Sequence, residues 1–168
     1  ASSTLGIVAL AVGLLMIGNE FDLSSGVAVT SAALVATMLN YNFHLNSWVG
    51  VGLSLLTALT IGALNGLLVT RTKIDSFLIT LAAFLMLQGL NLAITKLVTG
   101  QVATPTIADM EGFPSARVVF AGTFHVGSLS IRATVLWWIL FVAIASWVLY
   151  KTRWGNWIFA VGGDDAAA

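Results

Sequence analysis

The chain has 168 residues, of which 58% are hydrophobic and only 8% are charged. A water-soluble domain carries roughly a quarter charged residues, so this composition excludes such a domain and predicts an integral membrane protein in contact with lipid. Seven Lys and Arg residues balance seven Asp and Glu residues, and no cysteine occurs. The charge balance argues against nucleic acid as a partner, and disulfides and thiolate metal sites are excluded.

Five apolar segments follow one another, at residues 5–18, 27–39, 47–69, 76–98 and 133–150. A helix needs about 20 apolar residues to cross a membrane, so the third and fourth segments are long enough and the fifth is just long enough. The first two are too short alone, and together they can form one interrupted element. We therefore predict an all-α fold, a polytopic transmembrane helix bundle with a broken helix near residues 19–26.

The break at residues 19–26 has two interpretations. Non-helical backbone at membrane depth persists only where protein or a water-filled cavity covers it, so the break is either an interfacial turn or the lining of a path. Asp22, Ser24 and Ser25 can cap a helix that restarts near Gly26. A cation-coupled carrier would also place carboxylates here, and this alternative to a cap and turn rests on Glu20 and Asp22.

The cations predict the topology of the chain. Arg71 and Lys73 lie between the third and fourth segments, and Lys151 and Arg153 follow the fifth. Positively charged residues favour the cytoplasmic side of a membrane. The third and fifth segments then run inward, the fourth runs outward, and residues 99–132 form a periplasmic loop.

The periplasmic loop at 99–132 contains two prolines and several glycines, which are typical of irregular structure. Residues 118–120 and 129–131 are candidates for short strands within it. The chain starts at Ala1 and its last residues break off inside a motif. We therefore expect one transmembrane domain over residues 1–168, truncated at both ends.

Three amides lie inside or near the ends of predicted spans: Asn65, Gln88 and Asn91. An amide is costly in hydrocarbon unless it is paired. These side chains can contact a polar substrate such as a sugar, or they can form hydrogen bonds between helices, and both interpretations are open.

Small residues recur every fourth position on the third segment, at Ala58, Gly62 and Gly66. Such spacing lets a second helix approach closely, because lipid supplies no hydrophobic drive and packing must stabilise the contact. The pattern predicts a helix-packing stripe, either beside a pathway or in ordinary bundle packing.

The last residues of the chain come after the fifth apolar segment, two cations and two tryptophans. A span followed by cations and tryptophans is typical of a cytoplasmic membrane boundary. A glycine break and acidic residues then predict the start of a short helix on that side. Such a helix can hold a soluble partner. The residues assigned to this coupling element are Gly162, Gly163, Asp164, Asp165 and Ala166.

Enzyme signals are missing from the sequence. The glycine pair at 162–163 is not followed by the Gly-Lys-Ser or Gly-Lys-Thr of a phosphate loop, and no nucleophile elbow occurs. His44 and His125 are far apart, and neither has a ligand-type neighbour at metal spacing. We expect a non-enzymatic protein without a metal or cofactor.

Four stretches carry a resemblance to a known family, at residues 21–26 (FDLSSG), 62–69 with 73–81 (GALNGLLV and KIDSFLITL), 88–90 (QGL) and 152–168 (TRWGNWIFAVGGDDAAA). In this order they resemble the permease subunits of bacterial sugar ABC importers of the ribose/xylose type. Asp75 stands where that family usually has proline, which predicts a less rigid turn.

The resemblance implies a multi-pass protein of the bacterial inner membrane that moves a monosaccharide. It also implies a second permease copy as homo- or heterodimer partner, ABC ATPase subunits that hydrolyse ATP below, and a periplasmic sugar-binding protein above. ATP-driven closure would push on residues 162–168 and rock the helices. The residues assigned to the translocation path are Asp22, Ser24, Ser25, Asn65, Gln88 and Asn91.

Two other functions are compatible with the sequence. An ion-coupled secondary carrier or channel subunit would use Glu20 and Asp22 as its working groups. A membrane scaffold without transport would be insensitive to changes at Gly163 or Asp164. Substitutions at these residues therefore separate the three hypotheses.

Overall fold

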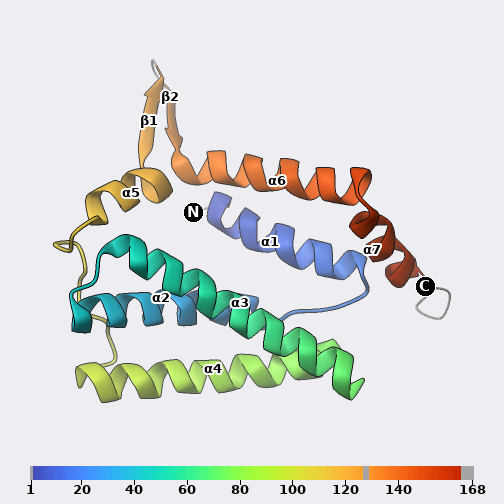
Figure 1. Cartoon of the computed structure of the whole chain (residues 1–168), viewed down its shortest axis with the longest axis horizontal. Helices are drawn as coiled ribbons and strands as arrows, with labels where there is room; N and C mark the ends of the chain where they lie inside the picture. Colours follow the sequence, from blue (N-terminus) through green and yellow to red (C-terminus); the bar gives the residue numbers. More distant parts are fainter. Residues whose placement is uncertain (1, 127–128, 164–168) are drawn as a thin grey trace. The chain divides into compact units, whose positions relative to one another are not determined.

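A computed structural model describes residues 2–126 and 129–163 of the chain (Figure 1). The chain divides into two compact units, one made of residues 23–117 and the other of residues 1–22 with 118–168. The boundary between the two units falls inside helix α5 (Phe113–Ala121).

The first of these units contains α2 (Ser25–Phe43), α3 (Ser47–Thr72) and α4 (Ser76–Thr99). Short turns join these helices, so successive helices run antiparallel. The side chain of Asn46 accepts a hydrogen bond from the N–H of Trp48 at 3.0 Å and caps the start of α3. Each helix ends at a residue in the left-handed conformation, as helix C-caps commonly do, namely His44, Lys73 and Gly100.

Helix α2 packs against both α3 and α4. The buried residues Ile79, Ala83 and Leu87 of α4 repeat at every fourth position, which is the spacing of one helix face. On α2, Asn40 is 1% exposed and lies directly against Gly50 of α3, where a Cβ atom would overlap its amide group. The glycine therefore lets the two helices approach around a buried polar side chain.

The segment after α4 returns to the start of α3. The N–H of Ser47 donates to the carbonyl of Glu111 at 2.9 Å, and the indole N–H of Trp48 donates to the Ser115 hydroxyl at 3.0 Å. Gly112 has a φ of 78° and lies against Asn46, so this turn requires glycine for both conformation and space. These contacts fix residues 111–115 at one end of α3.

Residues 118–120 are helical in α5, so the prediction of a strand there is wrong. Pro114 is accepted in the first turn of that helix, where its missing N–H costs nothing. The helix then continues through two valines, whose strand propensity it overrides, until Gly122. The prediction for residues 129–131 is confirmed by β2 (Leu129–Arg132), which pairs antiparallel with β1 (Thr123–Val126).

The second unit holds α1 (Ser2–Ile17), the hairpin, α6 (Ala133–Lys151) and α7 (Arg153–Gly163). Helix α1 lies beside α6 (Figure 1). The Ser3 hydroxyl donates to the Thr134 hydroxyl at 2.8 Å, and Gly6 lies against the indole ring of Trp138. The first turns of α1 and α6 are therefore neighbours, and the two helices run parallel.

Three of the described helices are long and apolar enough to cross a membrane: α3, α4 and α6. They coincide with the third, fourth and fifth predicted segments, and those predictions are confirmed. The helix break is also confirmed, because residues 18–24 are non-helical. Helix α2 extends to 19 residues, beyond the predicted 27–39, because its polar ends continue the helix. The assignment of one side to the cytoplasm stays a prediction.

Candidate functional site

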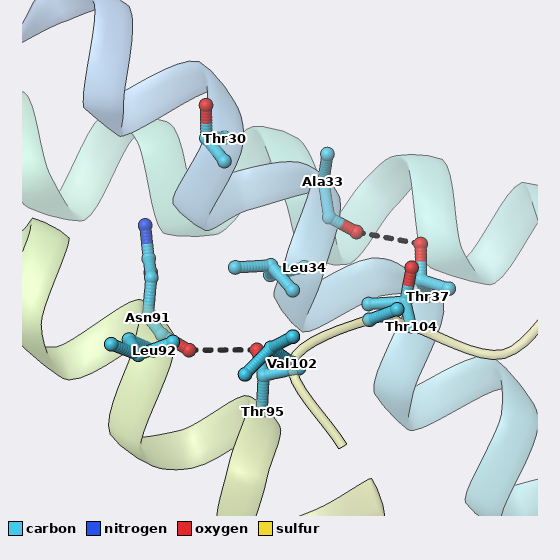
Figure 2. A pocket seen from close by; sticks show the side chains of 10 residues that line it. Thr30, Ala33, Leu34, Thr37, Asn91, Leu92, Thr95, Val102 and Thr104 are labelled. Carbon is cyan, nitrogen blue, oxygen red and sulfur yellow. Dashed lines mark hydrogen bonds between the residues drawn. The ribbon is translucent and has the colours of Figure 1, made fainter.

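A cavity lined by both apolar and uncharged polar residues lies between α2, the second half of α4 and residues 102–104 (Figure 2). Its volume is about 530 Å³, within the range of about 300–1,000 Å³ that is typical of small-molecule pockets. None of the ten side chains that line it is charged. Its polar residues are Thr30, Thr37, Asn91, Thr95 and Thr104.

Three threonines of the cavity have already donated their hydroxyl hydrogens, the first being Thr30, which donates to the carbonyl of Gly26 at 3.4 Å. Thr37 donates to the carbonyl of Ala33 at 2.8 Å, and Thr95 donates to the carbonyl of Asn91 at 2.7 Å, as Figure 2 shows. This bond to a carbonyl one turn earlier is common for threonine in helices. Because the hydrogen is used, each oxygen can only accept a further hydrogen bond. The cavity wall therefore offers acceptors.

Two side chains of the cavity keep their full hydrogen-bonding capacity. Within residues 2–126 and 129–163, the side chains of Asn91 and Thr104 form no hydrogen bond. Asn91 is half-buried on α4, and Figure 2 places Leu34 of α2 between it and Thr104. An amide and a hydroxyl can each donate and accept. The cavity can thus bind a neutral, hydroxyl-rich solute through both kinds of hydrogen bond.

A second polar cluster lies at the start of α2. The Asn65 amide nitrogen donates to the Ser24 hydroxyl at 2.8 Å, and the N–H of Leu23 donates to the Thr80 hydroxyl at 3.2 Å. Ser24 is 1% exposed and Asn65 is 8% exposed. Ser24 occupies the N-cap position of α2 but forms no side-chain cap bond. The cluster joins the start of α2 to both α3 and α4.

The six residues predicted for the path are thus distributed over different places. Asn91 lines the cavity, whereas Asn65 and Ser24 form the inter-helix hydrogen bond. Gln88 is exposed on α4 and does not line the cavity, and Asp22 and Ser25 are half-buried next to the start of α2. Their assignment to a translocation path stays a prediction.

The sequence reasoning missed the threonines of the cavity. Thr30 and Thr37 are seven residues apart on α2, and Thr95 is four residues after Asn91 on α4. These spacings place the members of each pair on one helix face. A search for polar residues at helical spacing would therefore have found them.

The small-residue stripe has no helix against it among the described residues. Ala58, Gly62 and Gly66 are exposed on α3, and a Cβ atom at either glycine would meet nothing within 4 Å in the part of the chain that the structure describes. The stripe is therefore open, and its role in packing stays a prediction.

Of the predicted coupling residues, Gly162 and Gly163 are the last two residues of α7. Gly162 lies against the backbone of Ile17 at the end of α1, whereas Gly163 has open space around it. Asp164, Asp165 and Ala166 lie outside the described residues. The helix expected to start there is accordingly still a prediction.

Comparisons with known proteins agree on a transport role. The family model described as "Branched-chain amino acid transport system / permease component" matches residues 1–168. The galactose/methyl galactoside import permease protein MglC of Escherichia coli (strain K12) is 33% identical over 180 residues, which cover 99% of this chain and 51% of the relative. No solved structure matches this chain significantly.

Two further relatives are similar over nearly the whole chain. The ribose import permease protein RbsC of Escherichia coli (strain K12) is 29% identical over 167 residues, covering 99% of this chain and 49% of the relative. The fructose import permease protein FrcC of Rhizobium meliloti is 27% identical over 169 residues, covering 97% and 44%. The chain therefore spans about half the length of these curated relatives.

Proposed function

Because this chain belongs to the family of branched-chain amino acid transport system permease components, we propose that it is part of the permease subunit of an ATP-driven importer for a monosaccharide. It is a multi-pass protein of the cytoplasmic membrane, with three helices that are long and apolar enough to span it. The names of the similar proteins specify ribose, galactose or methyl galactoside, and fructose as their substrates. The family description instead names amino acids, so the substrate class must be argued from the site.

The uncharged cavity carries the proposal for a sugar. A free amino acid has an ammonium and a carboxylate group, and burying either one without a partner of opposite charge is costly. None of the residues that line the cavity is charged, whereas its threonines, Asn91 and Thr104 offer neutral acceptors and donors. A monosaccharide carries hydroxyl groups that match both. The lining therefore favours a neutral polyol over an amino acid.

In the proposed mechanism, the permease provides the path for the solute and separate ATPase subunits provide the energy. Two ATPase subunits would bind on the cytoplasmic side, beyond α7, and a periplasmic sugar-binding protein would deliver the solute on the other side. A second permease copy or a close relative would complete the path. Closure of the ATPases would move α7 and rock the helices between outward and inward access.

An ion-coupled carrier is less well supported by the geometry. Such a carrier needs a carboxylate where the solute or ion passes. Glu20 and Asp22 are the candidates, and neither lines this cavity, whereas Glu20 lines a separate groove beside α1 and α7. The absence of a charge from that lining is compatible with a permease that is driven by ATP on separate subunits.

The test uses the full-length parent protein with its ATPase and binding-protein partners in proteoliposomes. We expect ATP-dependent uptake of one of ribose, galactose or fructose from a panel that also contains leucine. Uptake of leucine in place of every sugar would overturn the substrate class. Uptake that follows an ion gradient without ATP would overturn the importer.

A pair of substitutions on α4 then tests the cavity itself. Asn91→Leu removes a donor and an acceptor from the lining, so we expect sugar uptake to fall roughly tenfold, the effect of losing about 1.4 kcal/mol of hydrogen bonding. Gln88→Leu is the matched control, because Gln88 is exposed outside the cavity. Equal losses in both variants would remove Asn91 from the path.

A further inference from the structure

Two glycines lie on the same face of α7 and bring its two ends into backbone contact with other helices. Gly155 and Gly162 are seven residues apart, which is about two helical turns. A Cβ atom at either position would overlap a backbone carbonyl oxygen of another helix, that of Leu149 in α6 for Gly155 and that of Ile17 in α1 for Gly162. Helix α7 therefore bridges the last turns of α6 and α1.

The start of α7 is joined tightly to α6. The Thr152 hydroxyl donates to the carbonyl of Val148 at 2.6 Å and accepts from the N–H of Gly155 at 3.4 Å. With Gly155 directly against the backbone of Leu149, the turn at Thr152 has no side chain between the two helices. The start of α7 is thus in direct backbone contact with the end of α6.

The end of α7 contacts α1 in the same way. Gly162 lies against the carbonyl of Ile17, and its Cβ position is 3.4 Å from the Cα of Gly18. Beside this contact, Trp157 and Val161 of α7 and Leu14 of α1 line an apolar groove of about 340 Å³. The groove leaves space between the side chains, and the backbone contact at Gly162 lies beside it.

The neighbouring glycine provides an internal comparison. A Cβ atom at Gly163 would meet nothing within 4 Å in the part of the chain that the structure describes. The two glycines share the same helix end and the same intrinsic cost in a helix, and they differ in their contact with α1. Of the two glycines, only Gly162 therefore requires a residue without a Cβ atom.

We propose that α7 moves α1 and α6 together, and that Gly162 is the positioning residue through which it acts on α1. The chain itself links α7 to α6, whereas α1 is joined to it through packing. Packed interfaces shift as units rather than deform continuously, so a contact without side chains transmits displacement directly. The proposal rests on the proposed function, in which force reaches α7 from the ATPase subunits.

The first experiment compares Gly162→Ala with Gly13→Ala, a control in α1, in the full-length complex in proteoliposomes. We expect Gly162→Ala to lower the amount of sugar taken up per ATP hydrolysed at least roughly fivefold, with the ATPase subunits still bound. Gly13→Ala should stay near the unmodified ratio, because a Cβ atom at Gly13 of α1 would meet nothing within 4 Å in the part of the chain that the structure describes. An unchanged ratio in both variants would overturn the proposal.

A second experiment does not depend on the folding of Gly162→Ala. Leu14→Cys and Val161→Cys face the same groove, and the 168 residues contain no other cysteine, so a short bifunctional thiol reagent can join α1 to α7. If the two helices move as one unit, the cross-linked complex keeps its ATP-dependent uptake. Loss of uptake on cross-linking, with each single-cysteine variant active, would overturn the proposal.

These experiments distinguish a failure of the proposed function from a failure of the coupling through α1. Absence of ATP-dependent sugar uptake by the unmodified complex would refute the importer itself. Uptake by the unmodified complex, together with an indifferent Gly162→Ala variant or an inactive cross-linked pair, would refute the coupling through α1 alone.

Discussion

Asn65 of α3 donates a 2.8 Å hydrogen bond to the hydroxyl of Ser24, although 41 residues separate the two in sequence. Both side chains are buried, at the point where the chain leaves the helix break and α2 begins. A polar pair in this position stabilises the start of α2 against α3. The hydrogen bond therefore fixes the position at which the non-helical residues 18–24 end and α2 begins.

A double-mutant cycle measures this hydrogen bond. Asn65→Ala and Ser24→Ala should each destabilise the purified parent protein, and the double variant should lose less than the sum. We expect a coupling energy of about 0.5–1.5 kcal/mol, as for hydrogen bonds between membrane helices. Unfolding in detergent micelles supplies the free energies. Strictly additive losses would show that the two side chains act independently.

Substitutions of two glycines on α3 should have opposite effects. A Cβ atom at Gly50 would lie 2.8 Å from Cγ of the buried Asn40, so Gly50→Ala should destabilise the protein by about 1–3 kcal/mol. Gly52→Ala has open space and should be neutral or stabilise by up to about 1 kcal/mol. The comparison is made by thermal unfolding in detergent. Equal effects at the two positions would contradict the packing of Asn40 on Gly50.

Asp75 caps α4, because its carboxylate accepts a 2.8 Å hydrogen bond from the N–H of Phe77. The turn at the position where the resembled family has proline is therefore stabilised by a side chain. Asp75→Ala should cost about 1 kcal/mol of unfolding free energy, whereas Asp75→Ser keeps an acceptor and should cost little. Chemical denaturation in detergent checks both variants, and the idea fails if serine is as costly as alanine.

The topology can be tested with two single cysteines in the sequence, which has none of its own. Lys73 and Gln101 are exposed near opposite ends of α4. With a membrane-impermeant thiol reagent, Lys73→Cys should be labelled only in inside-out vesicles, and Gln101→Cys only from the outside of intact cells. A cysteine-free version of the parent protein provides the background. Reversed labelling would invert the orientation predicted from the cations.

The spans could be predicted from the sequence because length and hydropathy alone decide whether a helix can cross a membrane. Residues 47–69 and 76–98 correspond to α3 and α4 for that reason. The structure of residues 118–120 could not be predicted from the sequence in this way. Their valine pair has a local preference for strands, but the residues are part of helix α5.

The candidate site was only partly predictable. Asn91 is visible in the sequence because an amide inside a span is costly. Thr37 and Thr95 are nearly neutral in hydropathy and satisfy their own hydrogens within the helix, so only their helical spacing marks them in the sequence. The partner of Asn65 could not be inferred either, because a contact across 41 residues depends on how α2 and α3 pack.

The threonine oxygens of the cavity have a consequence for how long a solute stays there. Because Thr37 and Thr95 have committed their hydrogens to their own helices, they cannot reorient toward the acceptor atoms of a passing molecule. A hydroxyl-bearing solute then finds fixed acceptors for its hydrogens and, from Asn91 and Thr104, few donors for its oxygens. In the proposed function, this excess of acceptors over donors would shorten the time that a sugar stays in the cavity. If the cavity is part of the proposed path, it would favour throughput and leave discrimination between similar solutes to the place where they are first captured.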